Sequence, residues 1–325
     1  MENKVLFVGD LAIGSEDQQV FLNNLPLIDN IVVNLEGPFY LNRPDFQRFN
    51  RSFYNSVSTL NFIKNSGISH VNILNNHISD LGSSTIKSTI AILHQNQVGV
   101  LNYDELNISE VGSEMGVISL GSRLISCPSN WPNIEDEGIL AKVSSLISNS
   151  RFKRIVLYVH CGFEFEKHPE PWLRNRLIAL AKIQGITHII CVHSHVSKGF
   201  EKVGECLIFY GLGNFYIENE HFFSGKLKYP KECNKGLAIM IDNHKTRLFM
   251  TIKEDWSVSF VPIQKSDLIN YGLISDYVGF YNMNRRKYRF MLLPPHELIG
   301  ASGRVYVWII ELRFILIKLL IPFKR

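Results

Sequence analysis

Short apolar runs rich in Val and Ile recur along the chain, and each has the length of a strand rather than of a helix. They lie at 4–9, 30–35, 70–74, 154–159, 187–192 and 205–210. Apolar runs of this length between polar or turn-forming residues are typical of buried β-strands. We therefore predict a buried sheet core that uses all of these runs.

Helical patterns lie between several of these runs. One pattern covers 86–93 and follows Ser83 or Ser84, either of which is a candidate N-cap. A second covers 173–180, and Gly185 is its candidate C-terminal stop. Strands that alternate with helices predict an α/β architecture with substantial parallel pairing.

The pattern changes after about residue 236 to three strand-like stretches without helices between them. They cover 236–242, 247–253 and 257–263, and turn-forming residues at 243–245 and 254–255 separate them. This arrangement predicts an antiparallel meander that completes a second sheet.

The chain shows no internal repeat and no low-complexity linker, so we predict one domain over 1–265 and an extension over 266–325. Its 325 residues include 46% hydrophobic and 20% charged residues, which is ordinary globular composition. The net charge of +4 is too small for a dedicated nucleic-acid binder.

The cysteines and the N-terminus indicate the cellular compartment of the protein. Five cysteines without a CxxC pair do not indicate a disulfide framework. The apolar run that begins at Val5 is too short for a signal peptide. We therefore expect a cytoplasmic protein.

Side chains that can bind metals follow the predicted strands with unusual regularity. They are Asp10, Glu36, Asn76 with His77, His160, and His193 with His195. The carboxyl ends of the strands of an open α/β sheet share one edge, so these groups are expected to converge there. Imidazoles and carboxylates together suit Zn, Mn or Fe, and their number exceeds what one closed zinc site needs. We therefore predict two divalent metal ions and hydrolysis or transfer of a phosphate ester.

Six motifs appear in the order in which one known family carries them. They are Val8-Gly9-Asp10, Asn34-Leu35-Glu36-Gly37-Pro38, Asn75-Asn76-His77-Ile78-Ser79-Asp80-Leu81-Gly82, His160-Cys161-Gly162-Phe163-Glu164, His193-Ser194-His195-Val196 and Tyr210-Gly211-Leu212-Gly213-Asn214-Phe215. From about residue 4 to about residue 263 the chain resembles the CapA-like proteins of capsule and poly-γ-glutamate synthesis, a branch of the calcineurin-like metallophosphoesterase superfamily. The resemblance implies a layered sandwich of two mixed β-sheets flanked by helices.

The resemblance also implies a role for each matching residue. Asp10 and His195 would bind one metal, Glu36 would bridge, and Asn76, His160 and His193 would bind the second metal. His77 would stay off the metals and face the leaving group as the catalytic imidazole, and Asp80 would orient it.

Two departures from the family pattern concern the metals. The usual Asp-x-His is Asp10-Leu11-Ala12 here, so one histidine ligand is missing and affinity at the first metal site is expected to be lower. Cys161 stands where the family usually has a tryptophan, and it could add a thiolate near the site.

Charged residues outside the ligand set are candidates for contact with an anionic polymer or a phosphate ester. Glu164 follows His160 in a loop, and Arg48 and Arg51 lie in another. A solvated loop is the alternative for each of them.

The C-terminal extension carries an apolar segment, 305–323, which three charges interrupt. A membrane span needs about twenty mostly uncharged residues, so we predict an amphipathic helix instead. With the basic cluster at 285–289 it could lie on an anionic membrane surface on the inner face of the cell membrane, beside a capsule-synthesis complex. The alternative is a helix that packs on the domain or in an oligomer.

These observations favour a metal-dependent hydrolase in the synthesis of a capsule or other cell-surface polymer, either poly-γ-glutamate or a polysaccharide. One alternative is a non-catalytic metal-binding subunit of a membrane complex. Another is a general metallophosphodiesterase.

Overall fold

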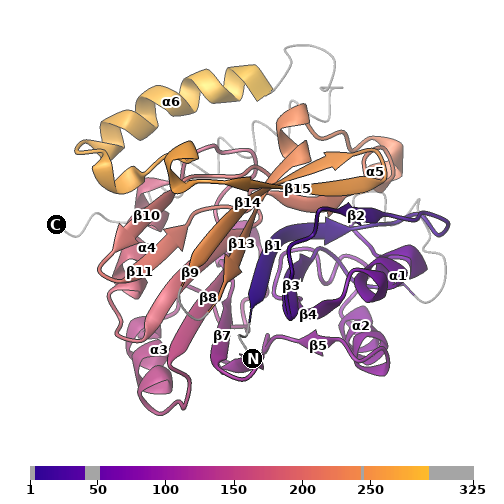
Figure 1. Ribbon diagram of the computed structural model, residues 1–325, viewed down its shortest axis with the longest axis horizontal. Helices are drawn as coiled ribbons and strands as arrows, with labels where there is room; N and C mark the ends of the chain where they lie inside the picture. Colours follow the sequence, from indigo (N-terminus) through magenta and orange to yellow (C-terminus); the bar gives the residue numbers. More distant parts are fainter. Residues whose placement is uncertain (1–3, 41–51, 243–244, 293–325) are drawn as a thin grey trace.

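The computed structural model describes residues 4–40, 52–242 and 245–292. Its core consists of two β-sheets that pack face to face between helices (Figure 1). The predicted layered sandwich of two mixed sheets with flanking helices is confirmed.

The first sheet has nine strands and is built around β1, which is buried at every position. Eight of the strands follow the order β2 (Phe21–Asn23), β15 (Ser257–Ile263), β14 (Thr246–Glu254), β13 (Lys235–Ile241), β1 (Val5–Ala12), β3 (Asn30–Leu35), β4 (Ile68–Asn72) and β5 (Gly99–Val100), and β12 (Asn214–Ile217) also pairs with β1. β1 runs parallel to β3 and β12 and antiparallel to β13. The sheet is therefore mixed.

The second sheet has six strands. Their order is β10 (Phe200–Val203), β11 (Cys206–Phe209), β9 (Ile186–Val192), β8 (Arg154–His160), β7 (Met115–Leu120) and β6 (Ser109–Val111). The four central strands run parallel, and the two edge strands β6 and β10 run antiparallel to their neighbours.

Helices cover the outer face of each sheet (Figure 1). α1 (Val57–Asn65) and α2 (Ser84–Gln95) pack apolar side chains on the first sheet, and α3 (Ile139–Ser148) and α4 (Pro171–Ala181) do so on the second. The remaining helical segments are α5 (Phe222–Gly225), α6 (Tyr277–Leu292) and the 3₁₀ turns η1 (Arg123–Ile125), η2 (Lys231–Asn234), η3 (Lys265–Asp267) and η4 (Tyr271–Leu273).

The inner faces of the two sheets meet in one apolar layer, to which β1, β8 and β9 all contribute. A buried hydroxyl also joins the sheets, because Tyr158 Oη on β8 donates to the carbonyl oxygen of Val8 on β1 at 2.6 Å. The ring of Tyr158 packs on Phe7, with centroids 5.9 Å apart. These contacts hold the ends of β1 and β8 beside each other.

The C-terminal meander forms as predicted, but it does not complete a second sheet. β13 pairs with β1, so β13, β14 and β15 extend the sheet that begins at the N-terminus. The pattern of apolar positions defines each strand, but it does not define the partner of β13.

The two predicted helices are present, with differences at their ends. Ser83 precedes α2, but its side chain makes no capping hydrogen bond. α4 ends at Ala181, and Gly185 lies beyond it at φ +96° in the turn before β9. A glycine suits this left-handed conformation, so Gly185 serves the turn rather than the helix end.

After residue 265 the described chain packs on the second sheet, where Tyr271 and Tyr277 are buried. No helix in the described ranges combines the length and apolar character that a membrane crossing requires. The predicted helix over 305–323 lies outside the described residues, as do the side chains of the basic cluster at 285–289.

Candidate metal centre

The predicted ligands lie at the carboxyl ends of strands from both sheets. Asp10 on β1, Glu36 after β3 and Asn76 after β4 belong to the first sheet. His160 ends β8 and the two histidines His193 and His195 follow β9, so they belong to the second. The prediction of a single sheet edge was wrong in this respect, because two sheets packed face to face contribute to the cluster.

Two carboxylates without solvent exposure lie at the centre of the cluster. Asp10 and Glu36 are both 0% exposed, and the Asn34 side-chain amide lies between them. Asn34 Nδ2 donates to Asp10 Oδ1 at 2.8 Å and to Glu36 Oε2 at 2.5 Å. Burial raises the pKa of both carboxyl groups, and the charge of Asp10 raises the pKa of Glu36 further. Ionising both carboxyls therefore requires a compensating positive charge.

Glu36, His160 and His193 form the first candidate ligand group, because their ligand atoms all lie within 4.8 Å of one another. His160 Nε2 lies 3.8 Å from Glu36 Oε1 and 2.8 Å from Asn76 Oδ1. Burial lowers the pKa of both histidines well below the ordinary value. Both rings are therefore held neutral, which is the form that binds metals.

Glu164, His193 and His195 form the second group, again with ligand atoms within 4.8 Å of one another. His195 Nδ1 lies 3.5 Å from Asp10 Oδ2, which brings Asp10 to the same group. The sequence interpretation of Glu164 was a substrate contact, whereas the geometry places its carboxylate among potential ligands.

The backbone beside these groups is in an uncommon conformation. His193 has φ +93°, His195 has φ +58° and Phe165 has φ +60°. Such non-glycine residues each cost on the order of 1–3 kcal/mol and concentrate at functional sites. The Phe165 N–H donates to Ser194 O at 2.9 Å, and the His193 N–H donates to Asp10 Oδ2 at 3.2 Å. These bonds hold the loop with Glu164 against the turn with the histidines.

The donor set fits divalent metal ions. Among the described residues, Glu36 Oε1, His160 Nδ1 and His193 Nδ1 are buried polar atoms without a hydrogen-bond partner. Buried polar atoms are otherwise nearly always bonded, so unpaired ones in a cluster of carboxylates and imidazoles point to a cation as the missing partner. The predicted thiolate of Cys161 does not fit, because burial raises the pKa of this thiol well above its ordinary value.

His77 and Asp80 form a pair beside the cluster. His77 Nδ1 lies 2.8 Å from Asp80 Oδ2, and the Phe53 N–H donates to the same oxygen at 2.8 Å. The His77 ring also meets the ring of Phe53 with centroids 4.6 Å apart. Asp80 is therefore placed to orient the imidazole.

Of the other candidate substrate contacts predicted from the sequence, the structure describes none. Arg48 and Arg51 lie outside the described residues. His168 and Glu170, which share the loop of Glu164, are buried and bond to Tyr271 Oη and to the Phe163 N–H.

Three further side chains contact the cluster and were not assigned a role from the sequence. Besides Asn34, they are Asn214, whose Oδ1 accepts from His195 Nδ1 at 2.8 Å, and Tyr229, whose Oη lies 3.4 Å from His195 Nε2. Asn34 and Asn214 belong to the motifs quoted in the sequence analysis, so their place in these motifs could have identified them as site residues. Tyr229 lies 34 residues from His195 and no pattern marks it.

Comparison with known proteins gives a family match over most of the chain. Residues 4–219 match the family described as bacterial capsule synthesis protein PGA_cap. Capsule biosynthesis protein CapA of Bacillus anthracis is 24% identical over 244 residues, which cover 65% of this chain and 59% of that protein. The match therefore spans less than two thirds of the length of this relative.

Among solved structures, a calcineurin-like phosphoesterase, YfkN of Bacillus subtilis, has a TM-score of 0.38 at 12% identity and covers 88% of this chain and 98% of its own. A dimetal phosphatase from Danio rerio has a TM-score of 0.40 at 9% identity, with 81% and 99% covered. NAD nucleotidase of Haemophilus influenzae has a TM-score of 0.39 at 13% identity, with 89% and 60% covered. The length of the family match shows that this chain belongs to the bacterial capsule synthesis protein PGA_cap family.

Proposed function

We propose that this protein is a metal-dependent hydrolase in the biosynthesis of a capsule or other cell-surface polymer, and that it cleaves a phosphate ester or a related linkage. The observation that carries the proposal is the pair of ligand groups that share His193 beside two buried carboxylates. A single closed structural site would need only four ligands.

Each part of the cluster has a proposed task. Glu36, Asn76, His160 and His193 would hold one cation, and Asp10 with His195 would hold the other, with His193 close to both because it belongs to both ligand groups. Glu164 would join the second set, because its carboxylate lies within 4.8 Å of the ligand atoms of His193 and His195. When bound, two divalent cations supply positive charge that polarises a phosphoryl oxygen and lowers the pKa of a water molecule.

His77 would act as the proton donor to the leaving group. Its Nδ1–H donates to Asp80, which fixes the tautomer and leaves Nε2 as the nitrogen that exchanges a proton with substrate. Asp80 is a positioning residue, because it acts only through His77.

A non-catalytic subunit is the second candidate, and the burial of the ligands favours it. Asp10, Glu36 and His160 are 0% exposed and His195 is 1% exposed. Catalytic metal sites keep an open position for substrate, whereas closed sites stabilise a fold. Such a subunit would keep the metals as a structural feature of a polymer-synthesis complex.

Turnover and capsule production with a His77→Ala variant separate the two candidates. The full chain, loaded with Mn or Zn, is tested on phosphomonoesters, aryl and nucleotide phosphodiesters and capsular polymer. We expect turnover that His77→Ala lowers by about 10²–10⁴-fold, with unchanged metal content. His94→Ala, at an exposed histidine on α2, is the control.

If no substrate is turned over and His77→Ala still supports capsule production in cells, the catalytic proposal is wrong. Turnover of simple phosphodiesters without any effect on capsule would favour a general metallophosphodiesterase instead.

Metal binding is expected to release protons. In the metal-free protein, burial raises the pKa of Glu36 well above 4.5 and also raises the pKa of Asp10, so both carboxyls hold protons above the ordinary carboxyl range. A cation displaces these protons, so affinity should rise with pH across that window. His160 and His193 add no protons, because their lowered pKa values already keep them neutral.

The raised pKa values of Glu36 and Asp10 also make the stability of the metal-free protein depend on pH. Groups with a raised pKa in the folded state stabilise the metal-free protein below their ordinary pKa, and this contribution is lost as pH rises through the raised value. Calorimetric titration with a divalent cation in buffers of different ionisation enthalpy measures the protons released on metal binding. A binding enthalpy that is the same in every buffer would contradict the prediction of proton release.

We also propose that the protein acts at the inner face of the cell membrane, through the predicted helix over 305–323. This location and its partners stay predictions, since they depend on residues outside the described ranges.

A further inference from the structure

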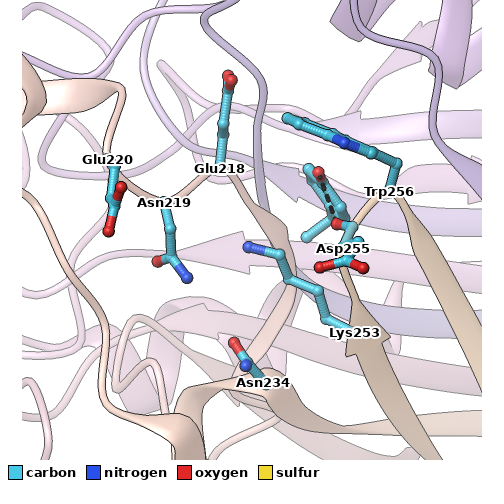
Figure 2. A pocket seen from close by; sticks show the side chains of 8 residues that line it. Glu218, Asn219, Glu220, Asn234, Lys253, Asp255 and Trp256 are labelled. Atoms are coloured by element: carbon cyan, nitrogen blue, oxygen red, sulfur yellow. Dashed lines mark hydrogen bonds between the residues drawn. The ribbon is translucent and has the colours of Figure 1, made fainter.

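A pocket of about 340 Å³ lies beyond the end of β12 (Figure 2), and none of its lining residues belongs to either ligand group. It is formed by residues from three segments: the end of β12, the turn between β14 and β15, and η2. Its volume lies within the range of small-molecule sites. None of the roles proposed above uses this pocket.

Two structural connections join the pocket to the candidate metal centre. β12 begins at Asn214, which accepts a hydrogen bond from His195, and the strand leads to Glu218 in the pocket wall. Four residues of extended chain span roughly 13 Å. Tyr229 forms the second connection, because its N–H donates to Asn219 Oδ1 at 3.3 Å and its Oη lies 3.4 Å from His195 Nε2. The pocket and the candidate metal centre are therefore joined by β12 and by the contacts of Tyr229.

The lining combines planar polar groups with one exposed aromatic ring. Figure 2 shows the side chains of Asn219, Asn234 and Lys253 directed toward one another across the pocket. Each amide carries two donor hydrogens and an acceptor oxygen, of which Asn219 Oδ1 already accepts from the Tyr229 N–H, and Asp255 adds a carboxylate acceptor. Trp256 is 40% exposed at the rim. Hydroxyl groups, which donate and accept at once, match such a lining, and the apolar C–H face of a sugar ring matches an indole.

The charges of the lining disfavour an anionic ligand. The lining includes three carboxylates, those of Glu218, Glu220 and Asp255, and a single ammonium group, that of Lys253. This ammonium already donates to Ile217 O and packs over the Tyr216 ring at 4.8 Å. Burial also lowers the pKa of Lys253 to about 8, which weakens it as a fixed positive charge.

The carboxylates are partly engaged within the protein. Glu218 Oε2 accepts from the N–H groups of Gly14 and Ser15 at 2.9 and 3.0 Å, and Glu220 pairs with Lys228 at 2.8 Å. The lining therefore keeps a small negative charge, which disfavours a polyanion such as a chain of glutamate residues, while its amides and indole match an uncharged, hydroxylated ligand.

We propose that this pocket binds a neutral sugar unit, with Trp256 against the ring face and the amides of Asn219 and Asn234 on the hydroxyls. This rests on the proposed function in one respect: the sugar would be part of a surface polysaccharide whose neighbouring linkage reaches the metal centre. The substrate class is then a polysaccharide rather than a chain of glutamate residues.

Nuclear magnetic resonance of the ¹⁵N-labelled full chain tests the proposal, since the indole N–H of Trp256 reports on the pocket. A Trp256→Phe variant assigns this signal. The probes are hexamers of glucose, galactose and N-acetylglucosamine, a γ-glutamyl hexamer and inorganic phosphate. We expect at least one neutral hexamer to shift the Trp256 signal, and the γ-glutamyl hexamer and phosphate to leave it unchanged.

Variants then connect the shift to the lining. Trp256→Ala and Asn234→Ala are expected to weaken saccharide binding by about tenfold or more, as measured by saturation transfer. Trp256→Phe keeps an aromatic face and should bind within a few-fold of the parent protein. Val261→Ala, at an exposed residue of strand β15, which begins directly after Trp256, is the matched control and should bind normally.

The proposal is overturned if no neutral hexamer shifts the signal, if the γ-glutamyl hexamer shifts it instead, or if Trp256→Ala binds saccharide as well as the parent. These outcomes are independent of the metal centre. Trp256→Ala should retain its metal stoichiometry. Absence of turnover in a parent protein that binds saccharide would count against the proposed function and not against the pocket.

Discussion

Replacing His193 with Asn is expected to weaken divalent metal binding by about 100-fold or more and to reduce the bound metal below two ions per chain. Loss of a residue that only supports a metal ligand already costs about 10–100-fold in affinity. Among the described residues, His193 is the side chain that the two ligand groups share, so its loss should affect both cations. Metal content after dialysis and calorimetric titration with Mn or Zn measure the change.

Asn is chosen because the backbone at position 193 has φ +93°. Asn tolerates the left-handed region better than most residues, so the turn and its hydrogen bond to Asp10 should persist while the imidazole is lost. A substitution that strained the backbone would confuse a loss of fold with a loss of ligand.

His188→Asn is the matched control, since His188 is a buried histidine on β9, the strand that leads to His193. Its Nε2 lies 2.9 Å from Thr246 Oγ1, and it belongs to neither ligand group. This variant should lose stability and keep its metal stoichiometry. If His193→Asn bound two ions with unchanged affinity, the metal centre as proposed would not exist.

Much of the architecture was predictable because each strand has a local signature. The run 30–35 became β3 at the same residues, and 154–159 became β8, one residue longer. The pairing of the strands was harder to predict from the sequence. Whether β13 joins β1 or a separate sheet depends on packing between segments more than 200 residues apart, which apolar periodicity does not encode.

At the candidate site, too, the sequence predicts some residues and not others. The ligand positions followed from one rule, since polar residues at the carboxyl ends of parallel strands converge. Glu164 lies beyond the end of β8 in a loop, where sequence does not fix direction, so its place beside His193 and His195 required the fold. The contact of Tyr229 could not be predicted from the sequence for the same reason, because Tyr229 reaches His195 from a separate loop.

Gly9→Ala is expected to destabilise the protein by at least about 3 kcal/mol, the upper part of the range for overpacked cores. A Cβ atom at this position would lie 1.8 Å from the carbonyl oxygen of Gly213 and 2.8 Å from its carbonyl carbon. Both atoms are backbone, so the clash can be relieved only by moving β1 and β12 apart. The hydrogen bond from the Asp10 N–H to Gly213 O, at 3.1 Å, would be stretched or broken.

The same displacement should reach the metal centre. β12 places Asn214 against His195, and β1 places Asp10 against the same histidine. Metal affinity in Gly9→Ala should therefore fall together with the free energy of unfolding, which urea denaturation measures. Gly116→Ala on β7 is the control, because it also adds a methyl group to a buried strand but does so away from the contact between β1 and β12. There the closest atoms are side-chain ends of Ile108 and Ile155, at 2.6 and 2.7 Å, which can shift, so this variant should lose less stability and keep its metal affinity. Equal losses in the two variants would mean that the contact between β1 and β12 does not control the geometry of Asp10.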